Sequence, residues 1–293
     1  MSSVTSRLAG LAPPADSRLG YLLRLSRPRF WFYLAGPAVV GVVYAADSVG
    51  DLFTPLTVGL FAYFLVPANV FLYGVNDVFD ADVDEQNPKK EDREVRYRGG
   101  RDVVLVVVGS GVLGVAMLPF LPTRAVVGVL VFLALAIEYS APPFRFKTTP
   151  FLDSLSNGLY VLPGVVAYAA VAGAYPPGWA VAGGWLWTMA MHTFSAVPDI
   201  EPDRAAGIRT TATVLGQRWT DVYCGVVWLL AAWAFLQVHP FLGGLLGVYP
   251  VFLAGVALSD VAVDRAYWWF PFLNTAVGAV MTNAALWRLV YGP

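Results

Sequence analysis

Long apolar runs without Asp, Glu, Lys or Arg recur along the whole chain, and they constrain its fold more than any other feature of the sequence. Many of these runs approach the roughly 20 residues that an α-helix needs to cross a bilayer. Hydrophobic residues make up 57% of the chain and charged residues only 13%, whereas a soluble domain carries about 25% charged residues. The sequence therefore predicts an all-α integral membrane protein of the cell membrane.

Pro and Gly residues at the turns between these runs divide them into nine predicted transmembrane helices. Their approximate bounds are 30–46, 54–75, 103–121, 123–138, 154–173, 179–197, 220–238, 241–258 and 268–288. Residues 1–28 contain no apolar core of signal-peptide length and are predicted to form a cytoplasmic leader. Residues 29–293 are predicted to form a single transmembrane domain.

Positive charges lie almost entirely on one side of this predicted topology. All of the 19 Lys and Arg residues except Arg124 and Arg288 fall in the leader or in the loops after the second, fourth, sixth and eighth spans. The positive-inside rule then puts the amino terminus and those loops in the cytoplasm. The middle of every predicted span lacks charged residues, which disfavours a transporter, because proton relays and ion pathways need ionisable groups at membrane depth.

An acidic segment, NDVFDADVDE, follows the second predicted span. Asn76, Asp77, Asp80 and Asp84 are spaced to share one helix face, and Asn69 lies two turns earlier on that face as a candidate cavity-lining residue. Two carboxylates about 4 Å apart repel by roughly 4 kcal/mol at an effective dielectric constant near 20, so the strip requires a cation. Mg²⁺ prefers oxygen donors and usually binds phosphate oxygens as well. The strip is interpreted as a platform for Mg²⁺ and a diphosphate. The alternative is a solvated acidic cap whose aspartates pair with Lys89, Lys90 and Arg93.

A second pair of carboxylates, Asp199 and Asp203, follows the sixth predicted span. Pro198 and Pro202 interrupt this segment, so the helix is expected to kink or unwind there. Both carboxylates can still face one ion, because irregular backbone is tolerated where it lines a polar cavity. Ser195, one turn earlier, is a candidate lining residue. The spacing alone is weak evidence, but two such clusters at cytoplasmic helix ends together favour one metal–diphosphate site near the cytoplasmic side.

Between the two clusters, the loop after the fourth predicted span carries Arg145 and Lys147, whose side chains suit phosphate oxygens. Tyr139 precedes them and can donate a phenolic hydrogen bond. The alternative is that both cations only anchor the loop at the cytoplasmic surface. Asp153 and Asn157, four residues apart at the start of the fifth span, either extend the polar lining or cap the helix.

Aromatic side chains near the first cluster are candidates for a further role. Tyr73, together with Phe71 and Phe79, can turn ring faces toward a carbocation and stabilise it. The two histidines, His192 and His239, are predicted to occupy packing or interfacial positions instead.

At these residues the chain resembles the UbiA superfamily of membrane prenyltransferases. The first family motif, Asn-Asp-x-x-Asp-x-x-x-Asp, is matched in full, and the second, Asp-x-x-x-Asp followed by Gly and Thr, is matched at 199–210. The resemblance covers nearly the whole chain and implies a nine-helix bundle around a central cavity, with two Mg²⁺ ions holding an isoprenoid diphosphate between the motifs. The metal ligands it implies are Asn76, Asp77, Asp80, Asp84, Asp199 and Asp203, and its five aspartates are the implied catalytic residues.

The diphosphate-binding residues that we expect are Tyr139, Arg145 and Lys147. The family's Tyr-x-x-x-Lys element is not matched at its spacing, because the cations here follow the tyrosine later. Within the superfamily, the segments around both motifs look most like the carotenoid branch of lycopene elongase/hydratases. That likeness implies dimethylallyl diphosphate as donor, the end of lycopene as acceptor, and products leading toward C50 carotenoids such as bacterioruberin.

Other interpretations remain open from the sequence. A UbiA-type enzyme could instead act on an aromatic quinone precursor or a glyceryl-phosphate lipid. A CDP-alcohol phosphotransferase is disfavoured because the Asp-Gly-x-x-Ala-Arg start of its motif occurs in neither cluster. The expected partners are an isoprenoid diphosphate, a lipophilic acceptor and the bilayer, with no nucleic acid and no protein partner.

Overall fold

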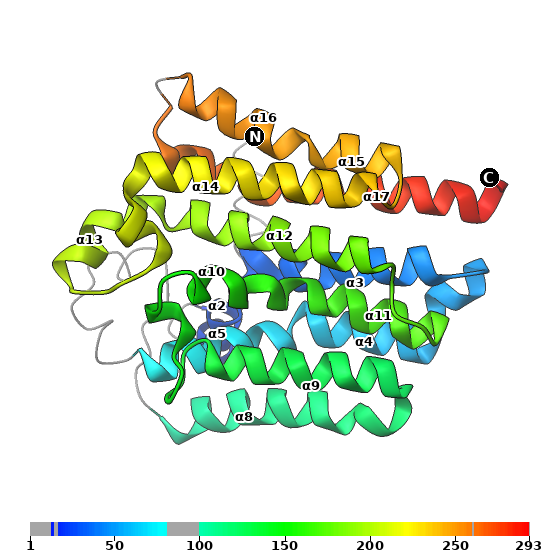
Figure 1. Ribbon diagram of the computed structural model, residues 1–293. Helices are drawn as coiled ribbons and strands as arrows, with labels where there is room; N and C mark the ends of the chain where they lie inside the picture. The colour runs from blue at the N-terminus through cyan, green and yellow to red at the C-terminus, as the bar shows by residue number, and fades with distance from the viewer. Residues whose placement is uncertain (1–12, 15–16, 81–99, 260, 293) are drawn as a thin grey trace.

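The computed structural model describes residues 13–14, 17–80, 100–259 and 261–292. This part of the chain consists of α-helices and short 3₁₀-helices joined by loops, with no strand among the residues described. Figure 1 shows the long helices lying side by side in one bundle. The prediction of an all-α fold is confirmed.

The longer helices of the bundle are α3 (Trp31–Ala45), α4 (Pro55–Leu65), α5 (Pro67–Phe79), α8 (Arg101–Ala116), α9 (Thr123–Glu138), α11 (Leu162–Ala172), α12 (Gly178–Ser195), α14 (Thr211–Leu236), α16 (Val248–Ala257) and α17 (Val263–Tyr291). The shorter elements are α2 (Arg18–Leu25), η1 (Pro28–Phe30), η2 (Val49–Phe53), η3 (Leu118–Phe120), η4 (Phe146–Thr148), α10 (Leu152–Ser156), η5 (Asn157–Val161), η6 (Val197–Asp199), α13 (Ile200–Ala205) and α15 (Pro240–Leu246).

Five helical stretches in the described part of the chain are long and apolar enough to cross a membrane. They are Pro55–Phe79, Arg101–Phe120, Leu152–Ala172, Thr211–Leu236 and Pro240–Ala257. The other four predicted spans also form helices, α3, α9, α12 and α17. Of these, α3 and α9 have 15 and 16 residues, fewer than the roughly 20 that span a bilayer unaided. The membrane character is therefore supported, while nine spans and the orientation stay predictions.

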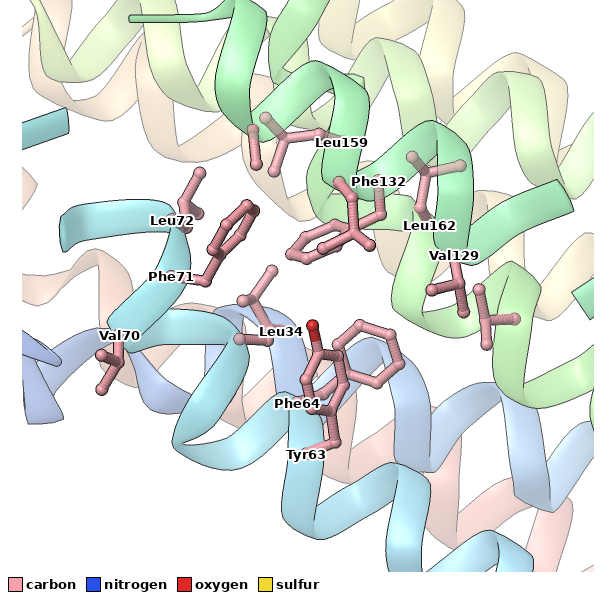
Figure 2. Packing of buried hydrophobic residues seen from close by; sticks show 14 of the residues in the cluster. Leu34, Tyr63, Phe64, Val70, Phe71, Leu72, Val129, Phe132, Leu159 and Leu162 are labelled. Atoms are coloured by element: carbon pink, nitrogen blue, oxygen red, sulfur yellow. The ribbon is translucent and has the colours of Figure 1, made fainter. Parts of the chain in front are cut away.

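Buried apolar side chains form two large clusters. The first cluster contains residues of α2, α3, α4, α5, α8, α9, η5 and α11. Figure 2 shows Leu34, Phe64, Phe71 and Phe132 within it. The rings of Phe64 and Phe132 meet edge to face, with centroids 5.6 Å apart. The second cluster joins α12, α14, α15, α16 and α17. The outer faces of these helices expose many large apolar side chains, which is the pattern expected of a surface that contacts lipid.

Close approach of α3 and α11 depends on two small residues. A Cβ atom added at Gly41 would lie 2.2 Å from the carbonyl oxygen of Gly164. Glycines at such crossings let the backbones of membrane helices pack directly against each other. The contact fixes α3 against α11.

The second predicted span is broken in its middle. α4 ends at Leu65, α5 begins at Pro67, and Val66 between them has φ −123° and ψ −60°. Proline has no N–H to continue the helical ladder. The buried Asn69 side chain donates from Nδ2 to the carbonyl oxygens of Phe64 and Leu65, both at 3.0 Å. Asn69 thus satisfies carbonyl groups that the break leaves without partners, a structural role for a residue predicted to line the cavity.

The segment before the first long helix is part of the bundle. α2 packs on α5, and its Tyr21 and Leu25 are buried in the first apolar cluster. Arg29 donates to the carbonyl oxygen of Trp268 at 2.9 Å and stacks on that indole ring, its guanidinium carbon 3.6 Å from the ring centroid. These contacts hold the residues between α2 and α3 in place, and Arg27 among them reaches the predicted site.

Candidate active site

The two predicted carboxylate clusters lie at the same end of the bundle. In Figure 1 this is the left end, where α5 finishes and where α13 and the loop between α9 and α10 are found. Asn76 and Asp77 are in the last turn of α5, and Asp80 is its C-cap residue. Asp84 lies outside the described residues.

Asp77 forms a buried ion pair that the sequence analysis did not anticipate. Its Oδ1 is 3.1 Å from Nη2 of Arg27, and the two side chains are only 2% and 20% exposed. The Arg27 guanidinium also lies over the Tyr73 ring, 4.5 Å from its centroid. The carboxylate and the ring face together hold this cation at the end of α5.

Asp80 is bound by the two basic residues of the predicted loop. Its Oδ1 accepts hydrogen bonds from Nη2 of Arg145, at 3.1 Å, and from Nζ of Lys147. The Lys147 and Asp80 side chains are 11% and 15% exposed, and the Arg145 side chain is 36% exposed. Nε of Arg145 is buried and has no hydrogen-bond partner in the described part of the chain. A buried N–H donor of this kind, on one cation and near a second, Lys147, suits an anionic oxygen.

Three residues other than glycine have positive φ among those described, and all three lie at this end of the bundle. Arg27 has φ 49°, Arg145 has φ 44°, and Phe151 has φ 68°. Each such conformation costs about 1–3 kcal/mol for a residue with a side chain. In two of the three positions the strained backbone supplies the arginine that pairs with a carboxylate of α5. Strain concentrated in this way is characteristic of functional sites.

The second cluster lies on irregular backbone, as predicted from its two prolines. α12 ends at Ser195, and the chain continues through η6, which ends at Asp199, and α13, which contains Asp203. Gly207, with φ 72°, follows α13, and the Ile208 N–H donates to the Asp203 carbonyl at 2.8 Å. Only glycine takes this left-handed position without strain, which explains the glycine of the motif. The Ser195 hydroxyl donates to the His192 carbonyl at 2.6 Å.

Asp153 connects the basic loop to the segment that follows the second cluster. Its carboxylate, 1% exposed, accepts a hydrogen bond from the Thr211 N–H at 2.9 Å and another from the Thr211 hydroxyl. The Phe151 N–H donates to the same hydroxyl at 2.7 Å. Asp153 therefore caps α14 from a neighbouring element, rather than capping its own helix. The Asn157 amide donates to the Asp153 carbonyl at 2.6 Å and supports this arrangement.

Arg204 stabilises the irregular start of α14. Gly216 interrupts that helix with φ 71° and ψ 164°, which leaves the Thr213 carbonyl without its usual helical donor. Arg204 donates to this oxygen from Nε at 3.0 Å and from Nη2 at 2.7 Å. The Arg204 guanidinium is thus bound by a backbone carbonyl within the protein.

A set of phenols and amides continues inward from the carboxylates. Nδ2 of Asn76 donates to the Ser140 hydroxyl at 3.1 Å. The hydroxyls of Tyr73 and Tyr160 are 3.3 Å apart. Tyr139, expected to bind diphosphate, has its hydroxyl 3.3 Å from Nε2 of His192. Of the aromatic residues considered for a carbocation, Phe71 packs in the apolar cluster and Phe79 is 45% exposed, which leaves Tyr73 beside the cations.

The residues present fit a divalent cation in their donor chemistry. Among the described residues, no group of three or more His, Cys, Asp and Glu side chains is placed to hold a metal ion, and Asp84 is outside that part of the chain. Asp77 and Asp80 offer carboxylate oxygens from one helix end, and both are held beside positive charge. Such oxygen donors are the ones Mg²⁺ prefers.

Comparison with known proteins identifies the class to which this site belongs. Residues 34–271 match the model of the UbiA prenyltransferase family. The chain therefore belongs to the UbiA prenyltransferase family, and the resemblance drawn from the two motifs is confirmed.

Particular relatives narrow the comparison. The chain is 60% identical over 289 residues to the lycopene elongase/hydratase of Haloarcula japonica, covering 98% of both sequences. It is 65% identical over 275 residues to the lycopene elongase/hydratase of Haloferax volcanii, covering 94% of this chain and 91% of the relative. The fold is similar to that of the solved structure of a UbiA homolog from Archaeoglobus fulgidus bound to DMAPP and Mg²⁺. The TM-score is 0.68 and the sequence identity 20%, and the match covers 92% of this chain and 99% of the homolog.

Sequence reasoning missed some residues of the candidate site. Arg27 was assigned to the leader, His192 to packing, and Tyr160 and Thr211 were not considered. A strip of carboxylates that needs cations is a reason to search every nearby Arg. The position of Arg27, directly before the first predicted span, was therefore the available signal.

Proposed function

We propose that this chain transfers a dimethylallyl group from dimethylallyl diphosphate to an end of lycopene, as a step toward C50 carotenoids. The observation that carries the proposal is the Asp80 carboxylate bound by Arg145 and Lys147, beside an Arg145 N–H that has no partner in the described part of the chain. Carboxylates for a metal and cations for a diphosphate meet there, at the end of a bundle with an apolar interior. The identity to two lycopene elongase/hydratases supports the choice of acceptor.

The metal-binding residues would be Asn76, Asp77, Asp80, Asp84, Asp199 and Asp203, around two ions. Bound Mg²⁺ would supply neutralisation of the charge that develops on the departing diphosphate. Arg145 and Lys147 would donate hydrogen bonds to the diphosphate oxygens, and their contacts with Asp80 hold these donors in position before the reaction begins. Tyr73 holds Arg27 against α5, with its ring under the guanidinium.

The reaction then follows from the chemistry of the two substrates. The bond between the allylic carbon and the diphosphate oxygen breaks, and its electron pair leaves with the diphosphate. A double bond of lycopene attacks the allylic cation and forms the new carbon–carbon bond. The resulting tertiary cation loses a proton or captures water, and the apolar interior limits access of bulk water to it.

The site assignment is tested with purified full-length protein and labelled dimethylallyl diphosphate. Asp80→Ala and Asp203→Ala should each abolish transfer to lycopene, while the protein still inserts into the membrane. Asp47→Ala is the matched control, because Asp47 is exposed in the loop after α3, which leads away from this site. Full activity of either site variant at limiting Mg²⁺ would refute the assignment.

The acceptor is tested separately from the site. The same assay is run with lycopene, an aromatic quinone precursor and a glyceryl-phosphate lipid, and we expect product from lycopene. A strain that lacks the protein should accumulate lycopene without C50 products. Unaltered carotenoids in that strain, or transfer to one of the other acceptors alone, would contradict the proposed function.

A further inference from the structure

One histidine lies among the phenols of the candidate site. His192 is in the last turn of α12, and its Nε2 is 3.3 Å from the hydroxyl of Tyr139, the C-cap residue of α9. The two rings are nearly perpendicular, at 85°, with centroids 5.9 Å apart. With the ring proton on Nδ1, Nε2 accepts the phenolic hydrogen bond.

The pair adjoins the residues that bind Asp80. The Tyr139 carbonyl oxygen accepts the Lys147 N–H at 3.1 Å, and the next residue, Ser140, accepts the Asn76 amide. Tyr139 is therefore beside the site where the diphosphate would depart.

The second ring nitrogen distinguishes His192 from the other histidine of the chain. No hydrogen bond to Nδ1 is found in the described part of the chain, so this atom is not committed to fixing the ring in place. By contrast, His239 is exposed and caps a helix, since its Nδ1 accepts the Phe241 N–H at 3.2 Å as the N-cap of α15.

We propose that Tyr139 and His192 act as the proton-accepting pair of this enzyme: Tyr139 takes the proton released when the tertiary cation is quenched and passes its own to Nε2 of His192. The proposal rests on the proposed function and names the groups that complete it. A base is required in both outcomes of that reaction, since elongation alone releases one proton and hydration also releases one.

Atoms and charges balance in both elongation and hydration when this pair accepts the proton. In elongation, the electron pair of a C–H bond next to the cationic carbon becomes the new double bond. The proton moves to the Tyr139 oxygen as the phenolic proton moves to Nε2. In hydration, an oxygen lone pair of water forms the C–O bond, and the excess proton of that water follows the same path. The imidazolium of His192 then releases its proton to solvent.

The experiment compares His192→Gln, Tyr139→Phe and His239→Gln with the wild type, using dimethylallyl diphosphate, Mg²⁺ and lycopene. Both kcat and the ratio of hydroxylated to dehydrated product are measured. Losing a general base costs about 100-fold or more, so kcat should fall by that factor in the first two variants. The KM for the diphosphate should stay within about twofold, because the removed groups act after binding. His239→Gln should behave as the wild type.

The product ratio separates proton transfer from a structural effect. Water is a weak nucleophile without a base, so His192→Gln should lower the hydroxylated fraction of whatever product remains, while misfolding would lower both products alike. If His192→Gln does not accumulate in the membrane, Tyr139→Phe carries the same test, since it removes only a hydroxyl group.

Two results would overturn the proposal. If kcat and the product ratio are unchanged in His192→Gln and Tyr139→Phe, another base acts, such as the departing diphosphate. If the wild type itself makes no lycopene-derived product, the proposed function fails and this proposal fails with it. The wild-type reaction therefore distinguishes the two failures.

Discussion

Removing Arg27 should destabilise the whole protein, because it leaves the Asp77 carboxylate buried without this guanidinium. Asp77 is 2% exposed and Arg27 is 20% exposed, and their charged atoms are 3.1 Å apart. Breaking a buried pair by removing one partner costs about 3–5 kcal/mol. Since the arginine is partly exposed, we expect the lower end, about 3 kcal/mol, for Arg27→Ala. With an unfolding entropy of about 2.1 cal/mol/K per residue and 293 residues, that corresponds to about 5 °C in Tm.

The measurement is thermal unfolding of the detergent-solubilised protein, made on Arg27→Ala, Asp77→Asn and the double variant. Asp77→Asn removes the charge that Arg27 neutralises, so the double variant should recover much of the loss. The difference between the double variant and the sum of the singles gives the coupling energy of the pair.

The chain offers a matched control at its surface. Arg18 and Asp102 form an ion pair at 3.9 Å, but their side chains are 91% and 59% exposed. An exposed pair contributes about 0–1 kcal/mol, so Arg18→Ala should change Tm little. If Arg27→Ala unfolds at the same temperature as Arg18→Ala, or if the double variant shows no coupling, the ion pair does not stabilise this end of the bundle.

Three further predictions follow from contacts at or near the site. Replacing both Arg145 and Lys147 by Ala should raise the KM for dimethylallyl diphosphate in the labelled-substrate assay, because two phosphate donors are lost; an unchanged KM would leave them an anchoring role. Asp153→Asn should lower Tm, since losing the charge that accepts two buried hydrogen bonds at the start of α14 costs about 1–3 kcal/mol; an equal Tm would refute this. Gly158→Ala should destabilise by about 1–3 kcal/mol or more, because its Cβ would lie 1.8 Å from the Trp185 ring, and co-replacement with Trp185→Leu should relieve the effect in the same unfolding assay.

Local patterns predicted the helices well where apolar runs were continuous. The predicted span 123–138 coincides with α9, because nothing in that run interrupts the helical ladder. The start of α14, at Thr211, was predicted nine residues too late, since the segment before residue 220 carries polar and charged residues. That segment is helical because Asp153 and Arg204 satisfy its free backbone groups from other elements.

Contacts between distant segments explain what could not be predicted in the site. The spacing of Asn76, Asp77 and Asp80 indicates one polar helix end, and it implies that cations must come from somewhere. It does not say from where: Arg27 is 50 residues from Asp77, and Arg145 is 65 residues from Asp80. Both arginines reach α5 from left-handed backbone positions. Residues with side chains rarely adopt this conformation, and the hydrophobic periodicity of the sequence does not predict it. The sequence therefore shows that the acidic strip needs cations to neutralise it. Which residues supply those cations depends on the packing of α2 and of the loop after α9.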